Sequence, residues 1–296
     1  MVDHQFGGHW TEQKLEALKR YLQAYRQIFE QNEKARYFKT IYIDAFAGTG
    51  ERKVSRDTSE ETFLFSSEDL PEIDSYKKGS ARIALELISP FDEYIFIDKR
   101  EDHANHLSST IENEYPSLAS RCTVLHGDGP ALMAELCSSR DWKKCRAVVF
   151  LDPYGMNVEW SLLKLIAATN AIDLWFLFPL GTGANRLLKR NAVPPKGFSD
   201  KLTRIFGTDD WKTAFYKSSQ QMGLFSEDAN IIKDASFDQI GAFLIEQLRT
   251  IFTGVAPTTK ALVNSRNNPM YLLCFAAGNT VGAKTAVKIA DHLLGR

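Results

Sequence analysis

The feature that most constrains the fold is a regular alternation of short apolar runs with helical segments. Each strand-like run is almost continuously apolar, which is typical of parallel strands that are buried on both faces. The alternation therefore predicts an α/β fold with a doubly wound, mostly parallel sheet, whose ligands bind at the carboxyl ends of the strands. The expected strands lie at 40–50, where the strand opens into a glycine-rich turn, and at 93–101, 122–129, 147–155 and 173–181. The expected helices lie at 79–89, 101–115, 130–138 and 158–169.

The remaining segments lie outside this alternation. Apolar residues at three- and four-residue spacing predict a helix from Thr11 to Asn32, with Thr11 as its cap. Residues 51–78 form an acidic insertion, and residues 182–258 a helical insertion after the fifth strand. Two strands around an Asn-Asn-Pro turn at 260–279 predict an antiparallel hairpin, and a helix at 280–294 follows. We expect an N-terminal helical extension at 1–39 and one domain at 40–296.

The composition is that of an ordinary globular protein. The chain has 296 residues, a net charge of −1 and 25% charged residues. This charge argues against a surface coated with basic residues, although it allows a local basic groove. No apolar run approaches the roughly 18 residues that span a bilayer, and the first residues, MVDHQFGGHW, lack the features of a signal peptide. The four cysteines form no Cys-x-x-Cys pair, so we expect reduced thiols in a cytoplasmic protein.

A glycine-rich turn follows the first strand, with the sequence DAFAGTG at 44–50. A nicotinamide fingerprint would need a third glycine where Lys53 stands, and the Gly-Lys-Ser/Thr of a phosphate loop is absent. The turn resembles the first motif of class I S-adenosylmethionine methyltransferases, in the Phe-Ala-Gly-x-Gly form common in amino-methyltransferases that act on nucleic acid. An ordinary strand-to-helix turn with two glycines is the alternative.

The resemblance assigns cofactor-binding roles around this turn and the next two strand ends. Gly48 and Gly50 would let S-adenosyl-L-methionine lie against the backbone, with Asp44 near its ammonium group. Asp98 would accept the ribose hydroxyls and Asp128 the adenine amine, although each aspartate could instead cap a helix. The remaining expected contacts are Phe46, Ala47, Lys99 and Gly129. The same fold implies seven strands in the order 3-2-1-4-5-7-6, with the seventh antiparallel.

The fourth strand runs directly into Asp152-Pro153-Tyr154-Gly155. This stretch resembles the Asp-Pro-Pro-Tyr motif of amino-methyltransferases with one proline missing, and also the Asp-Pro-Tyr/Phe-Gly of tRNA guanine-N2 methyltransferases. The resemblance implies that Asp152 and the Pro153 carbonyl accept hydrogen bonds from the target amine, while Tyr154 stacks on a flipped base. A turn built by Pro153 and Gly155 is the alternative.

Other residues suggest weaker sites. Arg186, Lys189 and Arg190 begin a basic segment at 186–204 that could follow a nucleic-acid backbone or simply form a solvated helix face. His103 and His106 have no third ligand nearby, so we expect surface residues and no metal site.

The whole chain resembles the three-Cys-motif partner protein family (TcmP). The matching stretches are HWTEQKLEALKRYLQAY, YIDAFAGTG, GSARIALE, FLDPYGM, FGTDDW and NPMYLLCFAAGN. This resemblance implies a methyltransferase-like fold and a partner, a cysteine-motif protein similar to radical S-adenosylmethionine enzymes. Two functions follow as hypotheses: methyl transfer to an amine, plausibly on a nucleobase, or a non-catalytic accessory module. A nuclease or repair component is less favoured, because Asp44, Asp98 and Asp128 are expected too far apart to share a metal ion.

Overall fold

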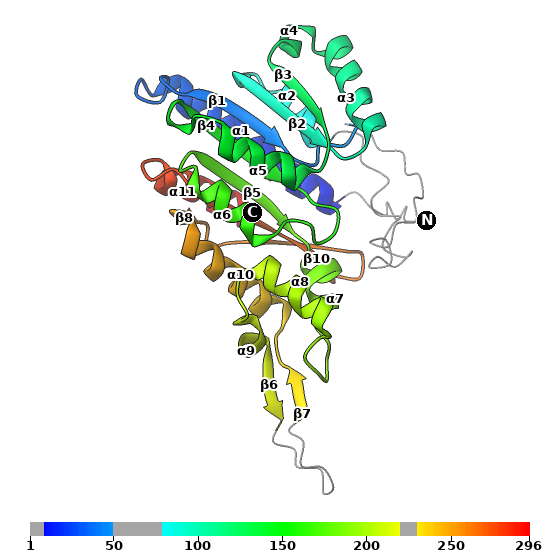
Figure 1. Cartoon of the computed structure of the whole chain (residues 1–296). Coiled ribbons are helices and arrows are strands. Elements are labelled where there is room, and N and C mark those ends of the chain that lie inside the picture. The colour runs from blue at the N-terminus through cyan, green and yellow to red at the C-terminus, as the bar shows by residue number, and fades with distance from the viewer. Residues whose placement is uncertain (1–8, 50–78, 220–229) are drawn as a thin grey trace, which may run out of the picture.

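A mixed α/β sheet forms the centre of the protein (Figure 1). The computed structural model describes residues 9–49, 79–219 and 230–296. Neighbouring strands follow the order β3-β2-β1-β4-β5-β10-β8, and β9 also pairs with β10. The first five strands are parallel, and β10 is antiparallel to β5. The strands are β1 (Lys39–Asp44), β2 (Glu93–Asp98), β3 (Cys122–His126), β4 (Cys145–Leu151), β5 (Ile172–Phe178), β8 (Gly254–Val255), β9 (Lys260–Val263) and β10 (Pro269–Ala277). The predicted mostly parallel α/β sheet is confirmed.

The predicted count of seven strands in the order 3-2-1-4-5-7-6 is wrong, because this sheet has eight strands. The outer edge of β10 is shared by two short strands. β9 pairs with the first part of β10, from Pro269 to Leu273, and β8 pairs with Ala276 and Ala277. A strand of nine residues leaves room for both partners. The predicted hairpin at 260–279 is present as β9 and β10, whereas β8 has only two residues and so carries no sequence pattern.

Alternate residues of each central strand face opposite layers of helices. In β1, Ile41 and Ile43 point into one hydrophobic core, and Tyr42 points into the other. The first core contains α5 (Gly129–Ser139), α6 (Trp160–Ala168), α8 (Lys196–Phe206) and α10 (Phe237–Ile251). The second contains α1 (His9–Gln31), α2 (Ser80–Leu85), α3 (Glu101–Glu114) and α11 (Ala283–Leu294), and the short α4 (Pro116–Ala119) follows α3. The sheet is therefore covered on both faces, as a doubly wound fold requires.

The first helix lies against the sheet and completes one of its faces. Its buried stripe is Leu15, Leu18, Tyr21, Leu22 and Tyr25, and it packs beside α2 and α11. The helix begins at His9, so Thr11 lies inside it and is not the expected cap. The division into 1–39 and 40–296 stays a prediction. The acidic insertion at 51–78 and Gly50 lie outside the described residues.

The region at 182–258 is helical only in part. A π-helical turn η4 (Leu180–Ala184), α7 (Asn185–Leu187) and α9 (Trp211–Phe215) accompany α8 and α10. Part of this segment is extended instead of helical, because α9 ends at Phe215 and the chain continues as β6 (Tyr216–Ser219), which pairs with β7 (Asn230–Lys233). The Tyr216 hydroxyl donates to the Lys189 carbonyl at 3.0 Å, which holds the start of this hairpin. In Figure 1 the hairpin projects away from the main sheet.

Within the described residues, no helix is both long and apolar enough to cross a bilayer. The four cysteines are all free thiols, three of them buried, so they contribute apolar packing and no cross-link.

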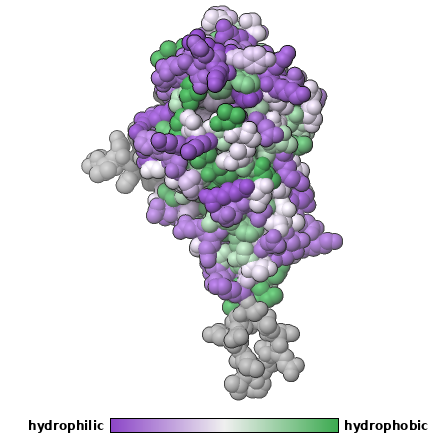
Figure 2. All heavy atoms as spheres, turned by 90° about the vertical axis from the view of Figure 1, so that its left-hand side faces the viewer, coloured by the Kyte–Doolittle hydropathy of each residue, from purple (hydrophilic) through white to green (hydrophobic). Residues whose placement is uncertain are grey.

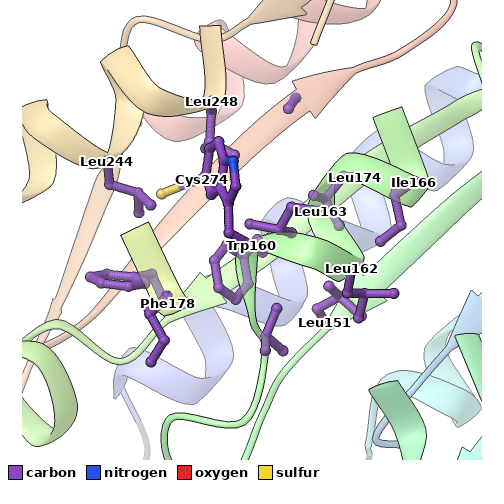
Figure 3. Close-up of a cluster of buried hydrophobic side chains, with 14 of the residues drawn as sticks. Leu151, Trp160, Leu162, Leu163, Ile166, Leu174, Phe178, Leu244, Leu248 and Cys274 are labelled. Atoms are coloured by element: carbon purple, nitrogen blue, oxygen red, sulfur yellow. The ribbon is translucent and has the colours of Figure 1, made fainter. Parts of the chain in front are cut away.

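Aromatic and aliphatic side chains fill the space between the sheet and α6, α8 and α10. Trp160 and Phe178 belong to this cluster, together with Leu244 and Leu248 of α10 (Figure 3). Gly207 ends α8 in the left-handed conformation, with φ +76°, and its N–H donates to the Thr203 carbonyl at 2.8 Å. A Cβ atom at this position would lie 2.1 Å from the Trp160 ring. Packing and backbone conformation therefore both require glycine here.

We expect Gly207→Ala to lower the free energy of unfolding by about 2–4 kcal/mol, because it adds left-handed strain to a clash with a buried ring. The matched control is Gly197→Ala in the same helix, where a Cβ atom would meet no heavy atom within 4 Å. This control should gain about 0.5–1 kcal/mol. Urea unfolding of both variants measures the difference, and equal effects would contradict the assigned role of Gly207.

Candidate active site

The aspartates predicted from the sequence lie at one edge of the sheet. Asp44 and Asp98 are the last residues of β1 and β2, Asp128 follows β3 by two residues, and Asp152 comes directly after β4. Because these strands are parallel and adjacent, their carboxyl ends meet at the same edge, on the right in Figure 1. The glycine turn connects the ends of β1 and β2, because it begins at Asp44 and its Gly48 N–H donates a hydrogen bond to Asp98 Oδ2 at 2.8 Å.

Asp44 is a buried carboxyl at the start of the glycine turn. It accepts hydrogen bonds from the Phe46 N–H at 3.2 Å and from the Tyr42 hydroxyl at 3.4 Å. Burial raises the pKa of Asp44 to about 7, the hydrogen bonds from Ser80 and Phe46 oppose this rise, and the nearby Asp152 charge adds to it. The carboxyl group is therefore poised between its neutral and ionised forms near neutral pH, and a cation beside it would favour ionisation.

The glycine turn leaves open space beside its backbone. Gly48 has φ +63°, which favours glycine, and a Cβ atom built there would meet no heavy atom within 4 Å. The Ala47 N–H donates to the Ile97 carbonyl at 2.9 Å, so the turn is tied to β2 on its other side. Ala47 is buried, Phe46 is partly buried, and the neighbouring Lys99 is exposed.

Asp98 connects the glycine turn to the start of α3. Its Oδ1 atom accepts the Arg100 N–H at 2.8 Å and lies 3.3 Å from Nδ1 of His103. The His103 side chain is 22% exposed, so this residue is not the free surface histidine that we expected, whereas His106 is exposed. The Oδ2 atom accepts the Gly48 N–H and has a second lone pair with which it can accept a further hydrogen bond.

Asp128 and Gly129 start α5. The Asp128 side chain accepts the Ala131 N–H at 3.1 Å, which is the helix-capping alternative raised by the sequence. Gly129 passes the backbone of the glycine turn so closely that an added Cβ atom would lie 2.2 Å from the Ala45 carbonyl oxygen. Packing alone therefore explains the glycine at this position.

The carboxylate of Asp152 forms an ion pair with the ammonium group of Lys14 in α1. The two side chains are 22% and 7% exposed, so the pair is largely shielded from water. Our sequence reasoning missed Lys14. The signal was its spacing, because Lys14 precedes Leu18 by four residues and Tyr21 by seven and so lies on the buried stripe of α1.

In the loop after Asp152, Pro153 is buried and Tyr154 is exposed. Pro153 and Gly155 line a small apolar recess together with Phe178 and Ile205, and Gly155 has φ +74°. The Tyr154 side chain is 52% exposed. The stretch therefore bends directly after β4 and presents the Tyr154 ring at the surface two residues after Asp152.

The basic segment lies beyond the carboxyl end of β5. Arg186 belongs to α7, and the exposed Lys189 and Arg190 follow it. The Lys189 ammonium lies 5.4 Å from the centre of the Phe198 ring, which is itself 37% exposed. A Cβ atom on Gly183 would lie 2.2 Å from the sulfur of Met156, so the Asp152 loop packs against η4, which directly precedes α7.

Across residues 9–49, 79–219 and 230–296, no group of three or more His, Cys, Asp or Glu side chains is placed to hold a metal ion. The acids at the carboxyl edge are paired with backbone N–H groups or with Lys14.

Comparisons with known proteins bear on the fold. No family model and no curated protein matches this chain. A Legionella pneumophila protein of family DUF519 is 13% identical, with a TM-score of 0.50, over 97% of this chain and 92% of its own. The methyltransferase domain of bacterial CtHen1-C is 8% identical (TM-score 0.38; 88% and 99% coverage). An O-methyltransferase from Bacillus cereus, in complex with SAH, is 12% identical (TM-score 0.35; 88% and 80%). The likeness to the Legionella protein shows a shared fold, and membership of the TcmP family stays a prediction.

We expect Lys14 and Asp152 to stabilise the fold as a coupled pair. Lys14→Met should cost about 1–3 kcal/mol, because it leaves a shielded carboxylate without its partner. The double variant with Asp152→Asn should recover part of this loss. A double-mutant cycle by urea unfolding measures the coupling. The exposed pair Glu16 and Arg20 on the same helix is the control and should couple by about 0.5 kcal/mol or less. Equal coupling in the two cycles would contradict the shielded geometry.

Proposed function

We propose that this chain is an S-adenosylmethionine-dependent methyltransferase whose acceptor is an amine, on a nucleobase or a similar group. The observation that carries the proposal is the carboxyl edge of the sheet. There the buried Asp44 and Asp98 flank an open glycine turn, and Asp152 follows the adjacent strand.

The residues present fit this cofactor, which supplies a methyl group on a positively charged sulfonium. The raised pKa of Asp44 reflects burial and the proximity of Asp152, and a bound cation relieves both effects. The ammonium group of the cofactor would supply that charge. Among the described residues, no heavy atom lies within 4 Å of a Cβ atom built at Gly48, which leaves room for a ligand against the backbone, and the second lone pair of Asp98 Oδ2 suits a hydroxyl donor. Phe46, Ala47, Gly50, Lys99, Asp128 and Gly129 remain proposed contacts.

Asp152 and the Pro153 carbonyl would hold the acceptor nitrogen. Both are hydrogen-bond acceptors, so an amine bound there donates its protons to them and turns its lone pair toward the methyl group. Holding the nitrogen in this orientation and away from water supplies much of the rate. The ion pair with Lys14 fixes the direction of the Asp152 carboxylate, which makes Lys14 a positioning residue. The Tyr154 side chain, which is 52% exposed, would stack on a base.

Exposed cationic side chains and the Phe198 ring, beyond the carboxyl end of β5, support a nucleic-acid acceptor. Lys189, Arg190 and Lys196 are exposed, and the Lys189 ammonium lies 5.4 Å from the centre of the Phe198 ring. Lysine and arginine contact phosphates, while aromatic rings stack on unpaired bases. Arg204 contributes less, because Glu159 pairs with it at 2.8 Å.

A second function is favoured by one observation: the carboxylate of Asp152 already has a cation partner in Lys14. An acid engaged in this way can have a structural role in a module that binds cofactor but transfers no methyl group. Such a module would act with a cysteine-motif, radical-SAM-like partner protein.

Asp152→Asn should abolish methyl transfer and leave S-adenosylmethionine affinity within about twofold, because the acid contacts the acceptor and not the cofactor. Asp98→Asn should weaken cofactor binding at least tenfold, whereas Asp238→Asn, at an exposed site on α10, is the control and should change neither. Calorimetry measures binding, and labelled methyl transfer to total RNA and denatured DNA measures activity. Cofactor binding by the wild type without transfer would favour the accessory module, and no binding at all would contradict both functions.

Cofactor affinity should fall as the pH falls below 7. Asp44 has a raised pKa of about 7, so it is ionised above that pH and protonated below it, and a cationic ligand binds the ionised form. The loss should approach roughly tenfold per pH unit well below 7. Calorimetry between pH 5.5 and 8.5 tests this, with Asp44→Asn as the variant in which the slope disappears and affinity is low throughout. The same slope in that variant would assign the pH dependence to another group.

A further inference from the structure

A second cavity lies at the opposite end of the sheet from Asp44, Asp98 and Asp152. It has a volume of about 540 Å³ and is enclosed by α1, the turn at 32–38, the first residues of β4 and β5, and the start of α11. Small-molecule sites commonly measure about 300–1,000 Å³. Figure 2 views the molecule from the end where the parallel strands begin, and hydrophobic residues gather in the middle of this face between hydrophilic ones.

Most of the cavity wall is apolar and aromatic. Tyr21, Tyr25 and Phe29 enter from α1, and Phe38 comes from the turn that follows. The Tyr25 and Phe29 rings are stacked with centres 4.6 Å apart, and the Tyr21 and Tyr25 centres are 6.2 Å apart. A wall of this kind suits a hydrocarbon chain or ring.

Two buried polar atoms of the lining residues lack hydrogen-bond partners in the described part of the chain. They are the hydroxyl of Tyr25 and Nε of Arg146. Tyr25 is only 5% exposed, so water does not compensate it fully. An unpartnered buried hydroxyl costs free energy in the folded protein, and a ligand that bonds with it removes that cost. Both atoms can donate, and Nε of Arg146 can only donate. They therefore call for an acceptor on the ligand.

The charges around the cavity favour an anion as that acceptor. The Arg146 guanidinium donates to the Cys145 carbonyl at 2.7 Å and lies 3.7 Å from the centre of the Phe38 ring, which fixes its plane. Lys34 supplies a second cation at the cavity, and Gly282 and Thr285 of the lining mark the start of α11, where the helix dipole is positive.

One acid, Asp173, faces these cations. It is buried, accepts the Tyr21 hydroxyl at 2.7 Å, and has a pKa raised by burial to about 7. The Asp173 side chain is thus only partly ionised near neutral pH, and its carboxyl group already accepts a hydrogen bond from Tyr21. Two cations and a helix start outweigh it, so the net preference of the site remains for negative charge.

We propose that this cavity binds an apolar monocarboxylic acid. Its carboxylate accepts hydrogen bonds from the Tyr25 hydroxyl and from Nε of Arg146, and its hydrocarbon part lies against the aromatic residues of α1 and the turn. No bond forms or breaks in this site. The proposal is independent of methyl transfer, because it concerns the amino ends of the strands and uses none of the carboxyl-edge aspartates.

The experiment uses the full chain without added cofactor and three probes of equal chain length: decanoate, decanol and decylamine. Calorimetry should show saturable binding of one decanoate per chain, with decanol and decylamine at least tenfold weaker because they lack the acceptor anion. No saturable decanoate binding, or equal affinity for the three probes, would overturn the proposal.

Tyr25→Phe separates a binding role from a structural one. It removes a hydroxyl that has no hydrogen-bond partner among the described residues, so the ligand-free variant should keep or gain thermal stability, while its affinity for decanoate falls at least fivefold. Tyr94→Phe is the matched control, because its buried hydroxyl accepts the Phe91 N–H at 2.9 Å outside the cavity. That variant should lose stability and bind decanoate unchanged. Unchanged decanoate affinity in Tyr25→Phe, or a loss as large in Tyr94→Phe, would show that the Tyr25 hydroxyl does not hold the ligand.

Discussion

Burial of the parallel strands on both faces is the constraint on which the rest of the structure depends. Helices cover β1, β4 and β5 from both sides, so polar side chains in the middle of these strands would have no access to water. Polar chemistry is therefore confined to the two ends of the strands. The carboxyl end gathers Asp44, Asp98 and Asp152, and the amino end places Arg146 and Asp173 beside a cavity.

The first helix takes part in both ends. Lys14, near its start, pairs with Asp152, while Tyr21 and Tyr25, further along, reach Asp173 and the cavity. Residues at this spacing share one face of a helix, so a single apolar stripe places all three side chains on the sheet. The helix thus supplies a cation to the candidate active site, although the methyltransferase-like pattern of the sequence begins only at β1.

Sequence reasoning identified the parts of the fold that depend on local patterns. The apolar runs of β1 to β5, the hairpin of β9 and β10 and the glycine turn at 44–50 all carry their signal within a few residues. It failed where the deciding partner is distant. Lys14 and Asp152 are 138 residues apart, β6 pairs across the segment at 220–229, and two-residue β8 exists only because β10 offers an open edge. The contact of His103 with Asp98 was also missed, although the two residues are close in sequence.

The position of α1 also sets an order of assembly during synthesis. Its apolar stripe is covered by β5, β10 and α11. Because α1 leaves the ribosome well before α11, its face is fully shielded only after α11 has emerged. Until then a stripe of leucine and tyrosine stays exposed in the growing chain, which is the kind of surface that chaperones bind. Contacts of such long sequence separation also slow folding, because closing the loop costs entropy before the contact forms.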